Sequence, residues 1–427
     1  MVYILEMTYQ AIESRSKVFN RYSHTDSWFW VAGSINPYRG CEHNCTYCDG
    51  KAEWYRIKNF GSHIKIKVDA AQKFEKELIR LGLTPDFRQR KETLEKFLPE
   101  FSKHSRMKRK KIPFFPIAVG GGVCDVYQPS EKKFKVTKKL LEKSRDFGIP
   151  VMVLTKSTLV LRDLDLLTEI NSLGYANLSF TITLIDERIQ NIFEPRSASS
   201  VQRFKALNTA RKSGLHGGVM LMPILPGIGD TEENIKQIVE KSKEAQAEFV
   251  LPGCLTLKPG RNKQEFLAVI KQHFPDLLPL YQDLYGNNSK YGNPNPNFKE
   301  VINSCKLTHE YCKKKGIPDR IPRYVPSGVP LKNFLISTTL HNLAYYLQWV
   351  EEKHWRSVMP FTKAANAIEG LSQDISRIKK AEIEYLKLPK KVFSVVSEVL
   401  ETGISSDLML YQDPKTILVN KEKVIVS

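Results

Sequence analysis

The strongest constraint on the fold is a regular alternation of apolar and amphipathic segments between residues 114 and 257. Short apolar runs are typical of buried strands, and apolar residues three and four positions apart are typical of helices. The apolar runs are 114–122, 149–157, 176–184, 215–225 and 248–257, and the helical stretches between them are 132–148, 161–174, 200–214 and 230–246. This order predicts parallel βα units in which helices cover the sheet.

Two more candidate strands precede this region. Residues 27–35 (SWFWVAGSI) form an apolar run, and in residues 63–68 apolar side chains alternate with lysines before a helical stretch from Ala70 to Leu81. About six units result, which are too few for a complete (βα)8 barrel. We therefore predict an α/β chain folded as a partial (βα)6 TIM-like barrel.

The character of the chain changes after the last apolar run. Residues 340–355 and 381–403 are expected to be helices of a separate, mainly helical C-terminal module, with a small hairpin at 408–420. We expect four parts: an N-terminal extension (1–30), the barrel (31–260, with a basic insertion at 82–112), a barrel-covering segment (261–330) and the C-terminal module (331–427).

The 427-residue chain carries a net charge of +19, with a pI of about 9.4. Such a surplus favours a polyanionic partner, mainly nucleic acid, although a generally basic proteome would also explain it. Six lysines and arginines together with His104 lie between residues 103 and 111. This run is either a solvated surface insertion or a contact with a phosphate backbone.

Cysteine usage and hydropathy indicate the compartment. The seven cysteines are odd in number and three lie within eight residues, which fits a reducing environment better than a disulfide framework. No run approaches the roughly 18 apolar residues of a membrane helix, and the first residues lack the layout of a signal peptide. We expect a cytoplasmic protein without a membrane partner.

Cys41, Cys45 and Cys48 form a C-x3-C-x2-C pattern directly after a Pro-Tyr-Arg-Gly turn. Three thiolates on one loop can hold three irons of a [4Fe–4S] cluster and leave the fourth iron open. A Cys3His zinc site that includes His43, or a chance grouping, are the alternatives. Zinc modules usually pair two short knuckles, and Cys305 and Cys312 are too far apart for a second one.

Functional groups of a parallel βα fold collect at the carboxyl ends of the strands. The predicted ends carry a glycine run, a lysine, a strand threonine and a turn-forming proline segment. In order, these are Gly120, Gly121 and Gly122; Lys156; Thr181; and Met222 to Gly227, which contains Pro223.

With Tyr47 before its last cysteine, the cysteine loop resembles the signature of radical S-adenosylmethionine (SAM) enzymes. From Asn36 to about Phe274 the chain resembles the spore photoproduct lyase-like branch of that superfamily, often labelled DNA repair photolyases. The segments that carry the resemblance are NPYRGCEHNCTYC, DVYQPSEKKFKVTKKLLE, LTKS, SFTIT followed by IFEPRS, and MPILPGIGD followed by TEENI. The chain after about residue 330 lies outside it.

The resemblance implies that the three cysteines hold a [4Fe–4S] cluster whose open iron binds SAM. It also implies SAM contacts from the ring of Tyr47, the glycine run, Cys124, Lys156, Thr181, Arg196 and the Pro223 segment. Reductive cleavage of SAM would require an electron donor such as a flavodoxin or ferredoxin. The expected substrate is a nucleic acid that is repaired or modified. The alternatives are a peptide or small-molecule substrate, or a non-catalytic zinc protein that binds nucleic acid.

Two positions depart from the pattern of the lyases. Gly122 stands where the lyases carry the cysteine that returns a hydrogen atom to the product, and Asp49 replaces a tyrosine. Cys124, two residues away, is the candidate replacement donor; otherwise it lines the SAM pocket. The SAM half of the site therefore matches the family, whereas the hydrogen-return relay does not.

Overall fold

The computed structural model describes residues 7–85, 115–120, 123–287, 289–295, 300–371, 373–378 and 387–419. Its centre is an open seven-stranded sheet in the order β10-β9-β8-β7-β6-β3-β2, in which only β2 runs antiparallel to its neighbour. The strands are β2 (Phe19–Arg21), β3 (Gly33–Ile35), β6 (Ile117–Val119), β7 (Val151–Thr155), β8 (Ala176–Thr181), β9 (Val219–Ile224) and β10 (Val250–Cys254). Six parallel strands in this order form the predicted partial barrel.

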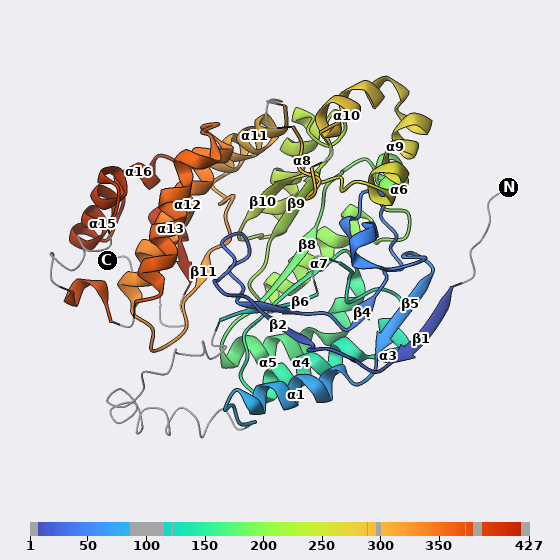
Figure 1. The fold of residues 1–427 in the computed structure, drawn as a ribbon, viewed down its shortest axis with the longest axis horizontal. Helices are drawn as coiled ribbons and strands as arrows, with labels where there is room; N and C mark the ends of the chain where they lie inside the picture. Colours follow the sequence, from blue (N-terminus) through green and yellow to red (C-terminus); the bar gives the residue numbers. More distant parts are fainter. Residues whose placement is uncertain are drawn as a thin grey trace.

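Helices cover the outer face of this sheet (Figure 1). Because each carries a buried apolar stripe, it packs back against the strands. The covering helices are α1 (Ala70–Arg80), α4 (Val136–Asp146), α5 (Leu164–Leu173), α7 (Ser200–Lys212) and α8 (Glu232–Glu244). Two short helices, α3 (Glu131–Phe134) and α6 (Glu187–Phe193), lie in the connections after β6 and β8. The predicted helix at 132–148 is divided at Lys135, whose φ of 50° ends α3 before α4 begins.

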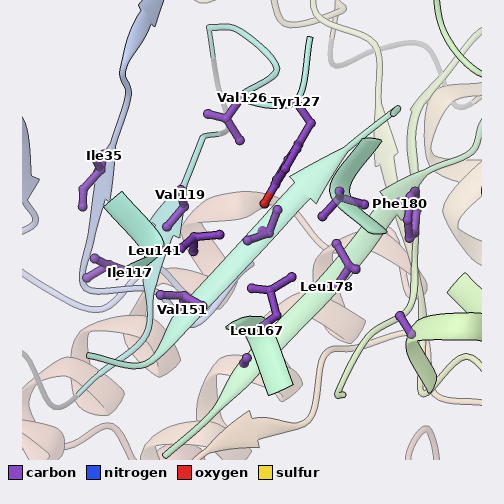
Figure 2. Packing of buried hydrophobic residues seen from close by; sticks show 14 of the residues in the cluster. Ile35, Ile117, Val119, Val126, Tyr127, Leu141, Val151, Leu167, Leu178 and Phe180 are labelled. Atoms are coloured by element: carbon purple, nitrogen blue, oxygen red, sulfur yellow. The ribbon is translucent and has the colours of Figure 1, made fainter. Parts of the chain in front are cut away.

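The two faces of the strands carry different packing, as the alternation of side chains along a strand requires. On the helix-facing side, Ile117 and Val119 of β6 and Val151 of β7 pack against Leu141 of α4 and Leu167 of α5 (Figure 2). The alternate residues face the inside of the curved sheet and join Trp30 in a second cluster, which contains Ala118, Met152, Met220 and Leu251. The interior is therefore filled with side chains.

One strand assignment needs correction. The lysine-rich strand is present as β5 (His63–Lys67), but it lies in a separate sheet between β1 (Thr8–Ile12) and β4 (Tyr38–Arg39). Only alternate residues of β5 are fully buried, whereas a strand inside a parallel barrel must be buried on both faces. The predicted strand at 27–35 is also shortened to β3, since Trp28 and Phe29 lie in a turn formed by Asp26.

The segment after β10 is more helical than expected. It contains α9 (Arg261–His273), α10 (Leu278–Tyr285) and α11 (Glu300–Lys315), and α11 packs against both α8 and β10. The sequence analysis described this segment only as a covering segment and did not predict these helices, of which α10 and α11 are separated by the polar stretch 286–299.

The C-terminal region packs α12 (Leu331–Trp349) and α13 (Trp355–Glu369) side by side, with α15 (Lys390–Thr402) and α16 (Ser406–Met409) against α12 (Figure 1). The predicted terminal hairpin is wrong: β12 (Leu418–Val419) instead pairs in parallel with β11 (Arg323–Tyr324), which lies far away in the sequence. None of the helices within the described ranges is both long and apolar enough to span a membrane. The four-part division of the chain stays a prediction.

Candidate functional site

The cysteine loop follows β4 and is held by the segment after β6. The loop turns back on itself through Asn44 N–H to Cys41 O (3.2 Å) and Cys48 N–H to Cys45 O (3.1 Å). Glu42 anchors it, because its carboxylate accepts from Ser130 N (2.6 Å) and its own N–H donates to the Gln128 side chain (2.8 Å). The motif DVYQPSE therefore serves as the support of the cysteine loop.

The three thiols of this loop lie in a protected environment. Burial raises the pKa of Cys41 well above its usual range, raises that of Cys45 to about 11 and raises that of Cys48, and Cys48 lies close enough to interact electrostatically with the other two thiols. Asp125 N–H donates to Cys41 Sγ at 3.5 Å. Buried thiols of this kind become thiolates when a metal supplies positive charge, so this donor set fits an iron–sulfur cluster.

The zinc alternative requires His43 to turn toward the cysteines. Its ring is instead engaged on both sides: Nδ1 lies 3.0 Å from Arg196 O and Nε2 lies 3.3 Å from Asp125 Oδ2. Within the described part of the chain, no three His, Cys, Asp or Glu side chains are grouped as ligands of a single metal ion. Cluster ligands, by contrast, bind separate irons.

Asp125 is the hub that joins the cysteine loop to the end of β7. Its carboxylate accepts from Thr155 Oγ1 (2.7 Å) and Lys156 N–H (2.7 Å), in addition to facing His43. Burial alone would raise the pKa of Asp125, but the hydrogen bond and charge of His43 and the backbone N–H groups of Lys156 and Tyr127 lower it to about 2. A permanently ionised Asp125 thus fixes the position from which Lys156 projects.

Lys156 and Tyr47 lie side by side at the strand ends. The Lys156 ammonium lies 5.6 Å from the centre of the Tyr47 ring, within cation–π range. Burial alone would lower the pKa of Lys156, but Cys45 and Glu194 raise it above its usual value. Lys156 is therefore a charged donor placed close to the cysteine loop.

Arg203 and Glu194 form a buried ion pair near Tyr47 that the sequence analysis did not predict. The Tyr47 hydroxyl and the Arg203 guanidinium both donate to Glu194, and Arg203 also donates to Thr181 O at 2.8 Å. Burial would raise the pKa of Glu194, but Arg203 and Lys156 lower it. The sequence did contain a sign of this pair: Arg203 lies on the buried stripe of α7 with Ser200, Leu207 and Ala210, where an arginine needs a buried partner.

Of the predicted SAM contacts after β6, the structure describes Gly120 and Cys124. Gly120 ends β6 with φ +87°, where a Cβ would lie 2.7 Å from Val126 Cγ1, so only glycine fits. Gly121 and Gly122 lie outside the described residues. Cys124 is buried, its thiol donates to Asn36 Oδ1 at 2.8 Å, and burial raises its pKa to about 12.

Three other predicted residues lie farther along the strand ends. Thr181 is buried at the end of β8, and Pro223 is partly exposed in β9 after a cis Met222–Pro223 peptide bond. Arg196 turns its guanidinium to Gly61 O (2.9 Å), while its backbone carbonyl meets His43. The side chain of Arg196 thus joins the cysteine loop region to the small sheet.

Helix α9 holds the other side of the cysteine loop. Asn262 Nδ2 donates to Cys48 O (2.9 Å), and Lys258 Nζ donates to Asp49 Oδ2 (2.6 Å) and to Tyr55 OH (3.2 Å). Asp49 stands where the lyases carry a tyrosine, and here it supplies the counter-charge for Lys258. Lys258 needs one because it is only 8% exposed.

Comparison with known proteins gives one family match and several related sequences. Residues 35–242 match the model of the radical SAM superfamily. An uncharacterised protein of Methanocaldococcus jannaschii is 28% identical over 244 residues, which cover 57% of this chain and 76% of that protein. An uncharacterised protein of Mycobacterium tuberculosis is 24% identical over 257 residues, which cover 59% and 66% of the two chains.

Among solved structures, spore photoproduct lyase complexed with dinucleoside spore photoproduct aligns at 15% identity with a TM-score of 0.47, covering 72% of this chain and 79% of that one. A doubly substituted variant of the lyase with bound AdoMet and dinucleoside spore photoproduct aligns at 16% identity, with the same TM-score and coverage.

Proposed function

This chain belongs to the radical SAM superfamily, whose model matches residues 35–242, and we propose that it is a spore photoproduct lyase-like enzyme that repairs or modifies a nucleic acid. The observation that carries the proposal is the set of three thiols on one loop, two of them buried and that of Cys48 partly exposed, beside the Lys156 ammonium. Cys41, Cys45 and Cys48 would hold a [4Fe–4S] cluster. When bound, the cluster and SAM would supply a 5′-deoxyadenosyl radical that abstracts hydrogen from the substrate.

The chain's own residues bind and orient the cofactors. Lys156 would donate a charge-assisted hydrogen bond to the SAM carboxylate, and the backbone at Gly120 would lie beside its amino group. Asp125 keeps Lys156 and the Cys41 sulfur in fixed relative positions. The ring of Tyr47 would lie beside the adenine, while its hydroxyl donates to Glu194.

The remaining predicted contacts complete the pocket. Thr181 would meet the ribose, the Pro223 segment the adenine, and Cys124 would line the carboxylate end. Gly121 and Gly122 belong to the same glycine run, and the Arg196 backbone carbonyl positions His43.

Several features support a nucleic acid in a reducing compartment. The net charge of +19 and the basic run at 103–111, which lies outside the described residues, favour a polyanion. None of the seven cysteines, all of which are described, forms a disulfide. We place the enzyme in the cytoplasm, where a flavodoxin or ferredoxin would supply electrons.

Anaerobic reconstitution tests the reaction class. Protein reconstituted with iron and sulfide should become brown. When this protein is then mixed with SAM and dithionite, it should release 5′-deoxyadenosine. The Cys48→Ala variant, treated identically, should do neither. A colourless zinc-containing protein that leaves SAM intact would rule the proposal out.

A deuterium experiment tests the substrate. DNA or RNA deuterated in its sugars and bases should transfer deuterium into 5′-deoxyadenosine if it is the hydrogen source. Turnover that is unaffected by either nucleic acid would instead favour a peptide or small molecule.

A further inference from the structure

An aromatic and cationic cluster on the surface directly follows the cysteine loop. Trp54 of η2 (Glu53–Tyr55) is 48% exposed and Tyr291 is 57% exposed, and their ring centres lie 6.1 Å apart in an edge-on arrangement. Tyr55 meets Trp54 edge-on at 5.7 Å. Large aromatic rings are seldom left exposed as a group unless they meet a partner. We call Trp54, Tyr55, Tyr291 and Lys290 the aromatic platform.

Internal packing leaves about half of Trp54 exposed, since the residue is 48% exposed. Lys258 Nζ lies 4.5 Å from the ring centre, but this buried lysine is already paired with Asp49 and Tyr55. The exposed half of the indole is thus not needed to satisfy Lys258. A half-exposed aromatic ring can accept a flat aromatic group by stacking.

Cations surround the rings. Exposed Lys290 lies 6.0 Å from the Trp54 ring and 5.8 Å from the Tyr291 ring, and exposed Arg39 donates to Tyr55 O at 2.8 Å. Of the nearby carboxylates, Asp49 is paired with Lys258, and Glu53 is exposed, so two exposed cations face one exposed carboxylate. The charges therefore favour an anionic chain that also carries flat rings.

The platform is held in a fixed position beside the cysteine loop. The loop that carries Tyr291 is anchored by Leu257 N–H to Gly292 O (2.8 Å), at a contact so close that a Cβ on Gly292 would lie 2.5 Å from Leu257 C. On the other side, Lys258 and Asn262 bind Asp49 and Cys48 O. A ligand on the platform would thus lie next to the reaction centre.

We propose that the aromatic platform binds an unpaired segment of the nucleic acid, with a base stacked on Trp54 and phosphates near Lys290 and Arg39. This inference rests on the proposed function and adds to it that the substrate is bound as a single strand or with extruded bases. Paired bases cannot offer their faces to a protein ring, whereas unpaired DNA and RNA both can.

The test measures binding of fluorescent oligonucleotides of about twelve nucleotides to the reconstituted full chain by anisotropy. Single-stranded DNA, single-stranded RNA and a blunt duplex are compared. Trp54→Ala should weaken binding of the preferred single strand by about 5- to 150-fold, the value of one lost base stack. Trp54→Phe should retain most of the affinity. Trp355→Ala is the matched control, because Trp355 is 51% exposed, lies outside the platform and has Arg356 5.4 Å from its ring centre. Its affinity for the oligonucleotide should match that of wild type.

Salt dependence separates the two kinds of contact. Trp54→Ala should lower affinity equally at all salt concentrations, whereas Lys290→Ala should make the log–log slope shallower by about 0.7, the value of one phosphate contact on a single strand. If wild type binds single strands and Trp54→Ala binds as Trp355→Ala does, the platform is wrong while the proposed function stands. If wild type binds no oligonucleotide but binds polyglutamate, the surface serves an acidic protein, and both the platform and the nucleic-acid substrate fail.

Discussion

At the scale of single residues, the site depends on how buried groups acquire or lose charge. Burial raises the pKa of all three loop thiols, yet Lys156 stays charged because Cys45 and Glu194 face it. A buried cation beside thiols whose pKa is raised needs compensating charge, which the proposed cluster and SAM would supply. Two predictions test this arrangement.

Each loop cysteine should be indispensable for the cluster. Cys41→Ala, Cys45→Ala and Cys48→Ala should each reduce reconstituted iron from about four per chain to near zero, because two thiolates do not anchor a cubane. Iron analysis and visible absorption provide the measurement, and Cys312→Ala, a buried cysteine in α11, is the matched control. Full iron content in any of the three loop variants would contradict the ligand assignment.

Lys156 should matter for SAM and not for iron. Lys156→Met should weaken SAM binding by about 10- to 150-fold, the value of a lost hydrogen bond to a charged group, with iron content unchanged. Isothermal titration under anaerobic conditions measures the SAM dissociation constant, and Lys205→Ala on the exposed face of α7 serves as control. An unchanged constant in Lys156→Met would remove Lys156 from the site.

At the scale of secondary-structure elements, buried polar groups join segments that the hydrophobic core alone would not align. Glu194 follows α6, Arg203 lies in α7 and Tyr47 belongs to the cysteine loop, and their hydrogen bonds converge on one carboxylate. Farther away, Arg323 pairs with Glu369 at 2.8 Å and so links β11 to α13.

The Glu194–Arg203 pair should be strongly coupled. Arg203→Met should lower the free energy of unfolding by about 3–5 kcal/mol, because it leaves a buried carboxylate without its counter-ion. Urea unfolding of Arg203→Met, Glu194→Gln and the double variant measures the coupling, and the double variant should be more stable than Arg203→Met alone. The exposed Arg188→Met change should have no measurable effect. Additive losses would mean that the pair is not a unit.

His341 of α12 should make the C-terminal region sensitive to acid. Burial and then the charge of Arg323 lower the pKa of His341 to about 4, so the unfolded chain takes up a proton near pH 6.5 that the folded chain refuses. Stability should therefore fall by about 3 kcal/mol as the pH drops from 6.5 to 4. His341→Phe should remove this part of the pH dependence in urea titrations, while the exposed His273→Phe should retain it. Parallel pH profiles for His341→Phe and wild type would contradict the lowered pKa.

At the scale of the whole molecule, charge surplus and architecture serve different tasks. The barrel gathers the cysteine loop, Lys156 and the strand ends at one side of the sheet, as parallel βα folds do. The charge of +19 acts over a longer range and raises the local concentration of a polyanion.

The basic run at 103–111 should contribute to this field. Neutralising Arg106, Lys108, Arg109, Lys110 and Lys111 should weaken nucleic-acid binding regardless of base sequence and make the log–log salt slope shallower by about 0.7–0.9 per lost phosphate contact. A control that neutralises Lys205, Lys212, Lys236, Lys241 and Lys243 on α7 and α8 changes the net charge equally. Identical salt slopes in the two variants would show that the run makes no specific phosphate contact.

Local patterns in the sequence determined the elements and the type of chemistry. Continuous apolar runs predicted the five central strands, and the 3.6-residue period predicted the helices between them. Three cysteines within one loop indicated the metal chemistry. All these signals lie within a few consecutive residues. The same local patterns led us to place β5 in the barrel and β12 in a hairpin, and both placements were wrong. A local pattern contains no information about which strand will pair with which.

Only the tertiary structure decided how distant groups meet. The contacts of Asp125 with His43, of Glu194 with Tyr47 and of Lys258 with Asp49 join residues 82, 147 and 209 positions apart. Trp54 and Tyr291 likewise lie 237 positions apart in the sequence and are neighbours only in the folded chain. Hydrogen bonds and charge pairs depend on strand order and on sub-ångström placement, which no local periodicity specifies. The residues that surround the predicted ligands, and the surface beside them, were therefore determined by the packing of the whole chain.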